Sequence, residues 1–184
     1  NKIVDFLIDV QHQLSKLTAN EFRFLAAHCT FWLSTEEMSV REKALEILKA
    51  YIEHTDLTSE HSLKIYKTII LSSIKYFLQS HFSREHVMKY FSMLVRAHSI
   101  KAKDLPEMEF SDLYQIIDEK DKDKDFFELI FNVKVSVRGQ AIKQLKKRME
   151  KRGAAFKSNT IKRVLAKIFD YYLYEYWQET ISVK

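Results

Sequence analysis

Apolar residues recur at intervals of three and four positions through nearly the whole chain, which is the spacing of one face of an α-helix. The pattern predicts helices over residues 3–14, 18–33, 39–54, 59–80, 84–98, 125–132, 135–152 and 158–178. Expected N-caps precede several of them: Thr18 (with Glu21 as its capping-box partner), Ser39, Ser59 and Ser83. Gly153 is expected to end the helix before it. The periodicity breaks over residues 101–124, which predicts an irregular acidic insertion there.

Composition supports a fold made only of helices. The chain has 46% hydrophobic residues, enough for a continuous core, but only two glycines and one proline in 184 residues. Sheet-rich folds need many tight turns, and tight turns use glycine and proline. The sequence therefore predicts an all-α protein.

One phrase of the sequence occurs twice. It reads Val-Arg-x-x-Ala-(Leu/Ile)-x-x-Leu, and its two copies are Val40, Arg41, Ala44, Leu45, Leu48 and Val137, Arg138, Ala141, Ile142, Leu145. In each copy the arginine falls within the apolar side of its helix. An unpaired buried charge is costly, so we expect Arg41 and Arg138 to bond an acid or a carbonyl of a neighbouring helix. The alternative is that each arginine extends its charged end to water.

The repeated phrase predicts a repeat architecture. A weaker third copy, with Met88 in place of the arginine, lies between the other two. The steps between copies are close to the roughly 40–47 residues of HEAT-type repeats, the second being slightly longer. We therefore predict that residues 1–184 form one segment of an α-solenoid of HEAT- or armadillo-like antiparallel hairpins. The chain begins without methionine, so we expect it to be a fragment of a larger protein.

The sequence offers little support for catalysis. It has no glycine-rich phosphate loop, and its seven histidines form neither an HExxH motif nor a zinc-like cluster with cysteine. We predict that the protein is not an enzyme and has no cofactor, catalytic residue or metal site. The single Cys29 favours a reducing, intracellular compartment. No apolar run reaches the length of a membrane span, and no membrane partner is expected.

Charge is distributed unevenly along the chain. Residues 104–128 contain ten acids, and residues 134–167 contain twelve bases and the single acid Glu150. A surface of one sign attracts phosphate backbones. The candidate contacts to RNA or another anionic partner are Lys143, Lys146, Lys147, Lys151, Arg152, Lys157, Arg163 and Lys167. The alternative is a solvated helix face that the acidic segment of the same chain neutralises.

The last predicted helix is rich in aromatic residues. Phe169, Tyr172, Leu173 and Tyr176 continue its apolar face, so most of them are expected in the core. Tyr171 and Tyr174 lie off that face. They are candidates for a protein interface.

Part of the chain resembles a known family. The phrase Asp125-Phe126-Phe127-Glu128, followed by Val133-x-Val135, Arg138, Ala141-Ile142 and Leu145, is similar to one found in the down-regulated-in-metastasis family. The resemblance covers residues 125–175. The chain departs from the family pattern at Ser136, Val137 and Gly139, where a histidine and several arginines are usual.

The resemblance implies a function and a location. Proteins of this family are very large HEAT-repeat scaffolds of the small-subunit processome, the nucleolar particle built around the U-three small nucleolar RNA. The resemblance implies that this protein is located in the nucleus and nucleolus as part of a large ribonucleoprotein complex. There it would contact precursor ribosomal RNA or small nucleolar RNA, and other ribosome-assembly proteins. Two other readings stay open: a HEAT-type adaptor between proteins with no RNA role, and a helical regulatory domain of an enzyme.

Overall fold

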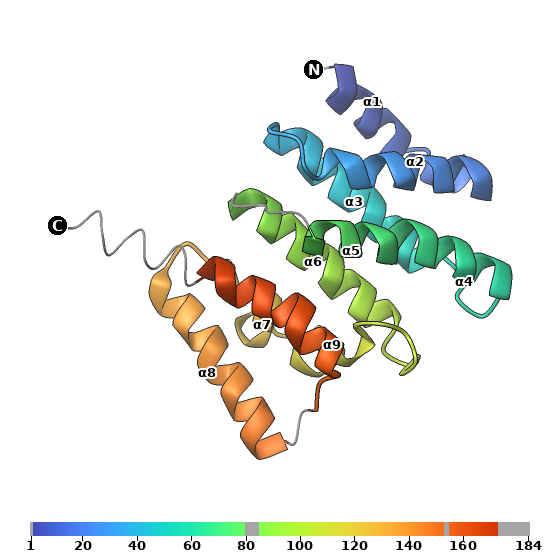
Figure 1. Ribbon diagram of the computed structural model, residues 1–184. Helices are drawn as coiled ribbons and strands as arrows, with labels where there is room; N and C mark the ends of the chain where they lie inside the picture. Colours follow the sequence, from blue (N-terminus) through green and yellow to red (C-terminus); the bar gives the residue numbers. More distant parts are fainter. Residues whose placement is uncertain (1, 80–84, 153–154, 173–184) are drawn as a thin grey trace. The chain divides into compact units, whose positions relative to one another are not determined.

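The computed structural model describes residues 2–79, 85–152 and 155–172 (Figure 1). Over these ranges the protein is all-α, and no strand occurs in them, as composition predicted. The chain divides into two compact units, residues 1–82 and 83–184, and each unit is described by itself.

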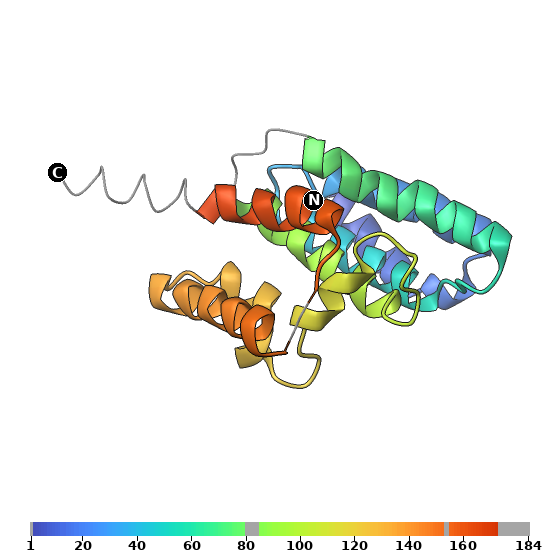
Figure 2. The ribbon, with the colours of Figure 1, turned by 60° about the horizontal axis from the view of Figure 1, so that its bottom comes forward.

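The first unit is made of helices that follow one another along the chain and are joined by short turns. Its elements are α1 (Lys2–Gln11), the 3₁₀-helix η1 (Leu14–Lys16), α2 (Ala19–Trp32), α3 (Met38–His54), α4 (Glu60–Tyr66), the π-helical turn η2 (Lys67–Leu71) and α5 (Ser72–Gln79). Helix α3 packs against both α1 and α2, and η2 packs against α2. Figure 2 shows that α4, η2 and α5 form one continuous rod, which matches the single helix predicted over residues 59–80.

Local capping explains where the helices of this unit begin. Thr18 Oγ1 accepts a hydrogen bond from the backbone N–H of Glu21, and the Glu21 carboxylate accepts one from the Thr18 N–H, so the predicted capping box is confirmed. Ser59 caps α4, also as predicted. The prediction for Ser39 is wrong, because Glu37 is the N-cap of α3 and the Ser39 hydroxyl donates instead to the Glu37 carboxylate.

The core of the first unit is formed by the facing sides of these helices. Fully buried side chains include Leu7, Ala26, Cys29, Leu33, Ala44, Ile47, Leu48, Tyr66, Ile70 and Ile74. Burial raises the pKa of the Cys29 thiol to about 12, so at neutral pH this side chain is an uncharged part of the core.

The second unit alternates long helices with short ones. Its elements are α6 (Glu85–Lys101), the 3₁₀-helices η3 (Ser111–Ile116) and η4 (Lys122–Lys124), α7 (Phe126–Ile130), α8 (Val135–Arg152), α9 (Ser158–Thr160) and the π-helical turn η5 (Ile161–Leu165), after which residues 166–172 are helical. Helices α7 and α8 pack together as a hairpin, and α6 packs against η3 and α7. The bounds of α8 are those that the periodicity predicted. Gly153 and Ser83, the predicted terminator and cap, lie outside the described residues.

The segment expected as an irregular acidic insertion contributes to the core of this unit. Phe110, Leu113 and Ile116 are buried in it, and Phe110 has the left-handed backbone conformation, with φ 64°. Two buried polar side chains of α6 hold the segment. His98 Nε2 donates to the Glu109 carbonyl at 2.7 Å, and Ser99 Oγ donates to the Phe110 carbonyl at 3.0 Å. The segment is therefore held against α6 by these two hydrogen bonds and by its buried side chains.

Asp125 is the buried junction between α6, the acidic segment and α7. Its side chain is 0% exposed and accepts hydrogen bonds from the backbone N–H groups of Phe127 and Glu128 as the N-cap of α7. It also accepts one from the Asp118 N–H at 3.1 Å and forms an ion pair with Arg96 at 2.9 Å. One carboxylate thus joins three parts of the second unit.

Replacing Gly139 by alanine is expected to stabilise the protein. Gly139 lies inside α8, and a Cβ atom built on it meets nothing within 4 Å. Alanine has a higher helix propensity than glycine, and it reduces the number of conformations open to the unfolded chain. The free energy of unfolding should therefore rise by about 0.5–1 kcal/mol. Urea denaturation followed by circular dichroism measures it, and a loss of stability would contradict the described helix.

Candidate nucleic-acid interface

The candidate interface is built on α8, whose two sides differ in character. Ala141 and Leu145 are buried on the side that packs against α7. At 100° per residue, Lys143, Lys146 and Lys147 fall on the opposite side, within an arc of about 100°. All three are exposed, as expected from the sequence. We call these three residues the lysine face. Met149 falls on the same side as Leu145 at 100° per residue, but it is 44% exposed.

The lysine face keeps most of its positive charge. The only acid near it on α8 is Glu150, whose carboxylate lies 3.7 Å from Lys146 Nζ, and both side chains are more than half exposed. Such an exposed pair is weak because water and salt screen it. Lys143, Lys146 and Lys147 together therefore present a cationic surface along little more than one turn of helix.

One flank of α8 is used to hold the acidic segment. Arg148 donates to the backbone carbonyls of Gln115 and Lys124, at 2.9 and 3.0 Å, and Gln144 donates to that of Asp123 at 3.3 Å. These bonds engage backbone carbonyls. The acidic segment is thus attached beside the lysine face, through the flank of α8 and not through the lysines themselves.

Lys157, a candidate contact on the basic surface, is exposed but is also hydrogen-bonded to the acidic segment. Its Nζ donates to the carbonyls of Pro106 and Met108, the second at 3.0 Å, and its backbone N–H donates to the Asp112 carboxylate. Asp112 also accepts from the Thr160 hydroxyl at 2.8 Å. These contacts tie the start of α9 to the acidic segment, because the carbonyls of that turn need donors. Lys157 therefore holds the start of α9 in place in addition to being exposed.

The other predicted basic contacts are distributed beyond the lysine face. Lys151 and Arg152 end α8, but their side chains lie outside the described part of the chain. Arg163 is exposed on η5, whereas Lys167 is half-buried in the helical stretch 166–172. The structure thus brings together Lys143, Lys146 and Lys147 on one side of α8.

The aromatic residues of the last helical stretch pack within the second unit. The Tyr171 ring, predicted at a protein interface, is half-buried with its centroid 6.1 Å from that of Phe131. The Tyr172 ring lies 5.7 Å from the Arg138 guanidinium carbon, within the range of a cation–π contact. Tyr174 lies outside the described residues.

The two repeated arginines are buried in the same register. Arg41 is 4% and Arg138 6% exposed, and each is the fourth residue of its helix, α3 or α8. Arg41 Nη1 donates to the carbonyls of Thr35 and Glu36, and Arg138 Nη1 to those of Asn132 and Val133. These carbonyls stand six and five residues before the arginine in both copies.

The expected partner of these arginines was a neighbouring helix, and the observed partner is closer in sequence. Both guanidinium groups bond the turn that joins their own helix to the preceding one, α2 to α3 or α7 to α8. A cation is favourable there because the carbonyls at a helix C-terminus carry partial negative charge. The repeated arginine therefore fixes the turn of its own hairpin. Bridging between repeats is not what these bonds do.

Replacing Arg41 or Arg138 by methionine is expected to destabilise its own unit. Methionine keeps most of the apolar stem but leaves two turn carbonyls without their charged donor. A hydrogen bond to a charged group contributes about 1.5–3 kcal/mol, so the free energy of unfolding should fall by about that amount in each variant. Urea denaturation measures both. Surface substitutions usually change stability by less than about 0.5 kcal/mol. A change below that size at both sites would mean that the arginines do not stabilise their turns.

A separate apolar groove lies on the first unit between α1 and α2. It has a volume of about 550 Å³ and is lined mainly by apolar side chains: Phe6, Val10, Leu17, Phe24, Leu25 and Trp32. Phe24 is 68% exposed and Phe6 49%. The sequence alone does not predict this groove, because a groove depends on how two helices pack.

Metal-ligand clusters and membrane-spanning helices are both absent from the described ranges. Within residues 2–79, 85–152 and 155–172, no three or more His, Cys, Asp and Glu side chains come together as metal ligands. No helix among these residues is both long and apolar enough to cross a membrane. No protein-family model matches the chain, and a search of curated proteins finds no match.

Proposed function

We propose that this chain is a segment of a non-catalytic helical-repeat scaffold that contacts RNA through the lysine face. The observation that carries the proposal is the exposure of Lys143, Lys146 and Lys147 on one side of α8, a helix whose own sequence contains one acid, Glu150, in a weak exposed pair. Proteins that follow a phosphate backbone without reading its sequence use such a row of exposed cations.

The repeat architecture is supported by two hairpins whose turns are bonded in the same way. The α2–α3 and α7–α8 hairpins each place an arginine at the fourth position of the second helix and bond it to the same relative carbonyls. Met88, at the corresponding place of the third copy, is buried in α6. Equivalent hairpins recurring along one chain are the building blocks of an α-solenoid, which we propose as the finer description of this all-α fold.

The proposed setting is ribosome assembly. The residues that resemble the down-regulated-in-metastasis family form the α7–α8 hairpin, and the lysine face is part of the same hairpin. A scaffold of the small-subunit processome would use such a surface on precursor ribosomal RNA or small nucleolar RNA, next to other assembly proteins. On this proposal the protein acts in the nucleolus.

The test is charge reversal of the lysine face. In the Lys143→Glu/Lys146→Glu/Lys147→Glu variant, we expect weaker binding to single-stranded RNA of any sequence. If the three lysines neutralise three phosphates, the slope of log affinity against log salt should become shallower by about 2, since each contact contributes about 0.7 on single strands. Fluorescence anisotropy at several salt concentrations measures it.

A matched control separates a local contact from overall charge. Lys16, Lys64 and Lys67 are exposed on the first unit, and reversing all three changes the net charge by the same amount. This control should keep the salt slope of the unmodified protein. An equal loss in both triple variants, or no loss in the α8 variant with its helicity intact, would contradict RNA binding by the lysine face.

A second candidate function is an adaptor between proteins with no RNA role. The observation that favours it is the apolar groove between α1 and α2, since amphipathic helices dock into grooves of this kind. The discriminating variant is Phe24→Glu, which places a charge in the groove and leaves α8 unchanged. Intact RNA binding in this variant is expected under the scaffold proposal, whereas absence of RNA binding by the unmodified chain would leave the adaptor as the better function.

A further inference from the structure

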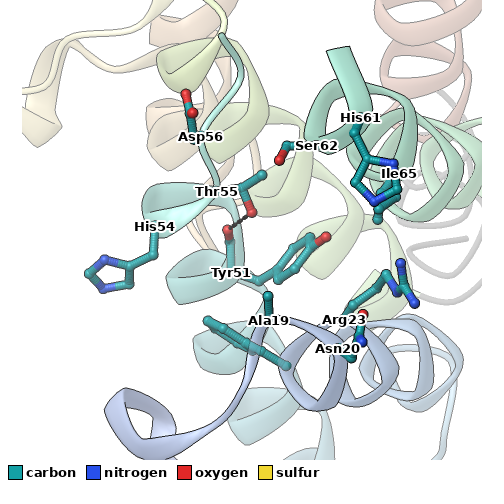
Figure 3. Close-up of a pocket in the computed structure, with 11 residues that line it drawn as sticks. Ala19, Asn20, Arg23, Tyr51, His54, Thr55, Asp56, His61, Ser62 and Ile65 are labelled. Atoms are coloured by element: carbon teal, nitrogen blue, oxygen red, sulfur yellow. Dashed lines mark hydrogen bonds between the residues drawn. The ribbon is translucent and has the colours of Figure 1, made fainter. Parts of the chain in front are cut away.

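The first unit contains a small polar pocket that the proposed function does not use. It lies where α2 begins, α3 ends and α4 begins, and it has a volume of about 230 Å³ (Figure 3). Ligand sites for drug-sized molecules usually range from about 300 to 1,000 Å³. This pocket is therefore sized for a single chemical group or side chain.

The floor of the pocket is aromatic and firmly placed. The Tyr51 ring is 6% exposed and meets the Phe22 ring edge to face, with centroids 5.2 Å apart and planes at 83°. Thr55 Oγ1 donates to the Tyr51 carbonyl at 2.6 Å, and the Asp56 carboxylate accepts from both the N–H and the hydroxyl of Thr58. These bonds order the turn after α3 that forms one wall.

The rim of the pocket supplies hydrogen-bond donors from two helices. Asn20 and Arg23 come from α2, and His61 and Ser62 come from α4. In Figure 3 the guanidinium of Arg23 and the imidazole of His61 lie on the same side of the Tyr51 ring. His54 lines the opposite side and points away from the ring. Donors from different elements can therefore reach one group from more than one direction.

Arg23 is the strongest of these donors. Its side chain is half-buried, and among the described residues its guanidinium has no hydrogen bond or ion pair. Its charge acts on the pocket floor, because it partly opposes the rise that burial causes in the pKa of Tyr51. Arg41 and Arg138, by contrast, are engaged with backbone carbonyls. Arg23 is thus a cation directed at a pocket with an aromatic floor.

We propose that this pocket binds the phosphate group of a phosphorylated side chain with an aromatic or apolar stem, presented by a partner peptide. A guanidinium matches the oxygens of a phosphate in a forked geometry, and a tetrahedral phosphate can accept further hydrogen bonds from His61, Ser62 and Asn20. The apolar stem would lie on Tyr51, Phe22 and Ile65. This inference is independent of RNA binding by α8, since it concerns the other unit.

The proposal can be tested by titrating the whole, isotopically labelled chain with phenyl phosphate and with inorganic phosphate. Saturable shifts of the backbone amide signals of residues 19–23 and 51–62 are expected in nuclear magnetic resonance spectra. Phenyl phosphate should bind several-fold more tightly than inorganic phosphate, because only phenyl phosphate reaches the aromatic floor. Benzoate at equal ionic strength serves as the carboxylate comparison and should bind more weakly than phenyl phosphate.

Variants identify the residues responsible. Arg23→Gln should weaken phenyl phosphate binding at least about tenfold, the effect of losing one forked charge contact. Lys64→Gln, an exposed lysine of α4 outside the pocket, removes the same charge and should leave the affinity within about twofold. If Arg23→Gln does not fold, Arg23→Lys replaces it, and it should also weaken binding because lysine lacks the fork.

Several results would overturn the proposal. The first is the absence of a saturable shift up to about 20 mM ligand, a concentration well above the roughly millimolar dissociation constant of a weak site. The second is an unchanged affinity in the Arg23 variants. The third is an equal affinity for phenyl phosphate and inorganic phosphate. Each is distinguishable from failure of the proposed function, because neither Arg23 nor Lys64 lies on the lysine face. RNA binding of Arg23→Gln should equal that of the unmodified protein.

Discussion

Replacing Arg96 by methionine is expected to lower the stability of the second unit by about 3 kcal/mol or more. Asp125 is fully buried, and its ion pair with Arg96 supplies the only opposite charge that the structure gives it among the described residues. Removing one partner of a buried pair typically costs about 3–5 kcal/mol, because the remaining charge stays out of water. The three backbone N–H groups that also bond Asp125 place the expected loss at the lower end. Urea denaturation measures it.

A surface pair provides the control for this experiment. Lys103 and Glu119 also form an ion pair in the second unit, at 3.8 Å, with both side chains about 40% exposed. Lys103→Met should cost at most about 1 kcal/mol, as exposed pairs do. Adding Asp125→Asn to the Arg96→Met variant should cost less than the sum of the two single changes, because the unpaired charge is removed. Equal losses for Arg96→Met and Lys103→Met would contradict the structural role of Asp125.

The sequence predicted those parts of the fold that local rules determine. The capping box of Thr18 and Glu21 and the bounds of α8 depend on neighbouring residues, and both are as predicted. The burial of Arg41 and Arg138 followed from helical periodicity alone. Their partners did not, because a carbonyl five or six residues upstream is reached only after the chain has turned. The sequence could indicate that these arginines need a partner, but it could not say which one.

The acidic segment shows the limit of composition as a guide. Its many acids and broken periodicity suggested an irregular insertion, yet Phe110, Leu113 and Ile116 are buried in the core of the second unit. Backbone carbonyls of this segment accept hydrogen bonds from Arg148 and from Lys157, and Lys157 was a candidate contact of the basic surface. A pattern of side-chain charges contains no information on which carbonyls a folded turn leaves available.

The pocket on the first unit could not have been predicted from sequence at all. Its residues come from three helices and belong to no spaced motif. Arg23 and His61 are distant in the chain, and only the packing of the rod 60–79 against α2 brings their helices together. The lysine face, by contrast, lies on a single helix, where spacing along the sequence determines direction in space. Sites confined to one helix are predictable from sequence, whereas sites formed between helices require the structure.

Acidification is expected to destabilise the protein through His98 before the carboxylates titrate. His98 is fully buried, and burial lowers its pKa to about 4 despite its hydrogen bond to the Glu109 carbonyl. The unfolded chain keeps the ordinary pKa, near 6.5. Stability from this group is complete above pH 6.5 and is lost as the pH falls toward 4, because only the unfolded state takes up the proton there. The loss should be about 1.4 kcal/mol per pH unit, or about 3 kcal/mol in all.

His98→Gln separates this effect from all other titrations. Glutamine can still donate to the Glu109 carbonyl but does not titrate, so the difference in unfolding free energy between the two proteins isolates the histidine. Urea denaturation at pH 7.5, 5.5 and 4.5 should show the unmodified protein losing stability faster than the variant at each step. Parallel pH profiles would contradict a neutral, buried His98. Its charging would break the contact that holds the acidic segment on α6, so Ser99 and Phe110 should lose amide protection from hydrogen exchange together.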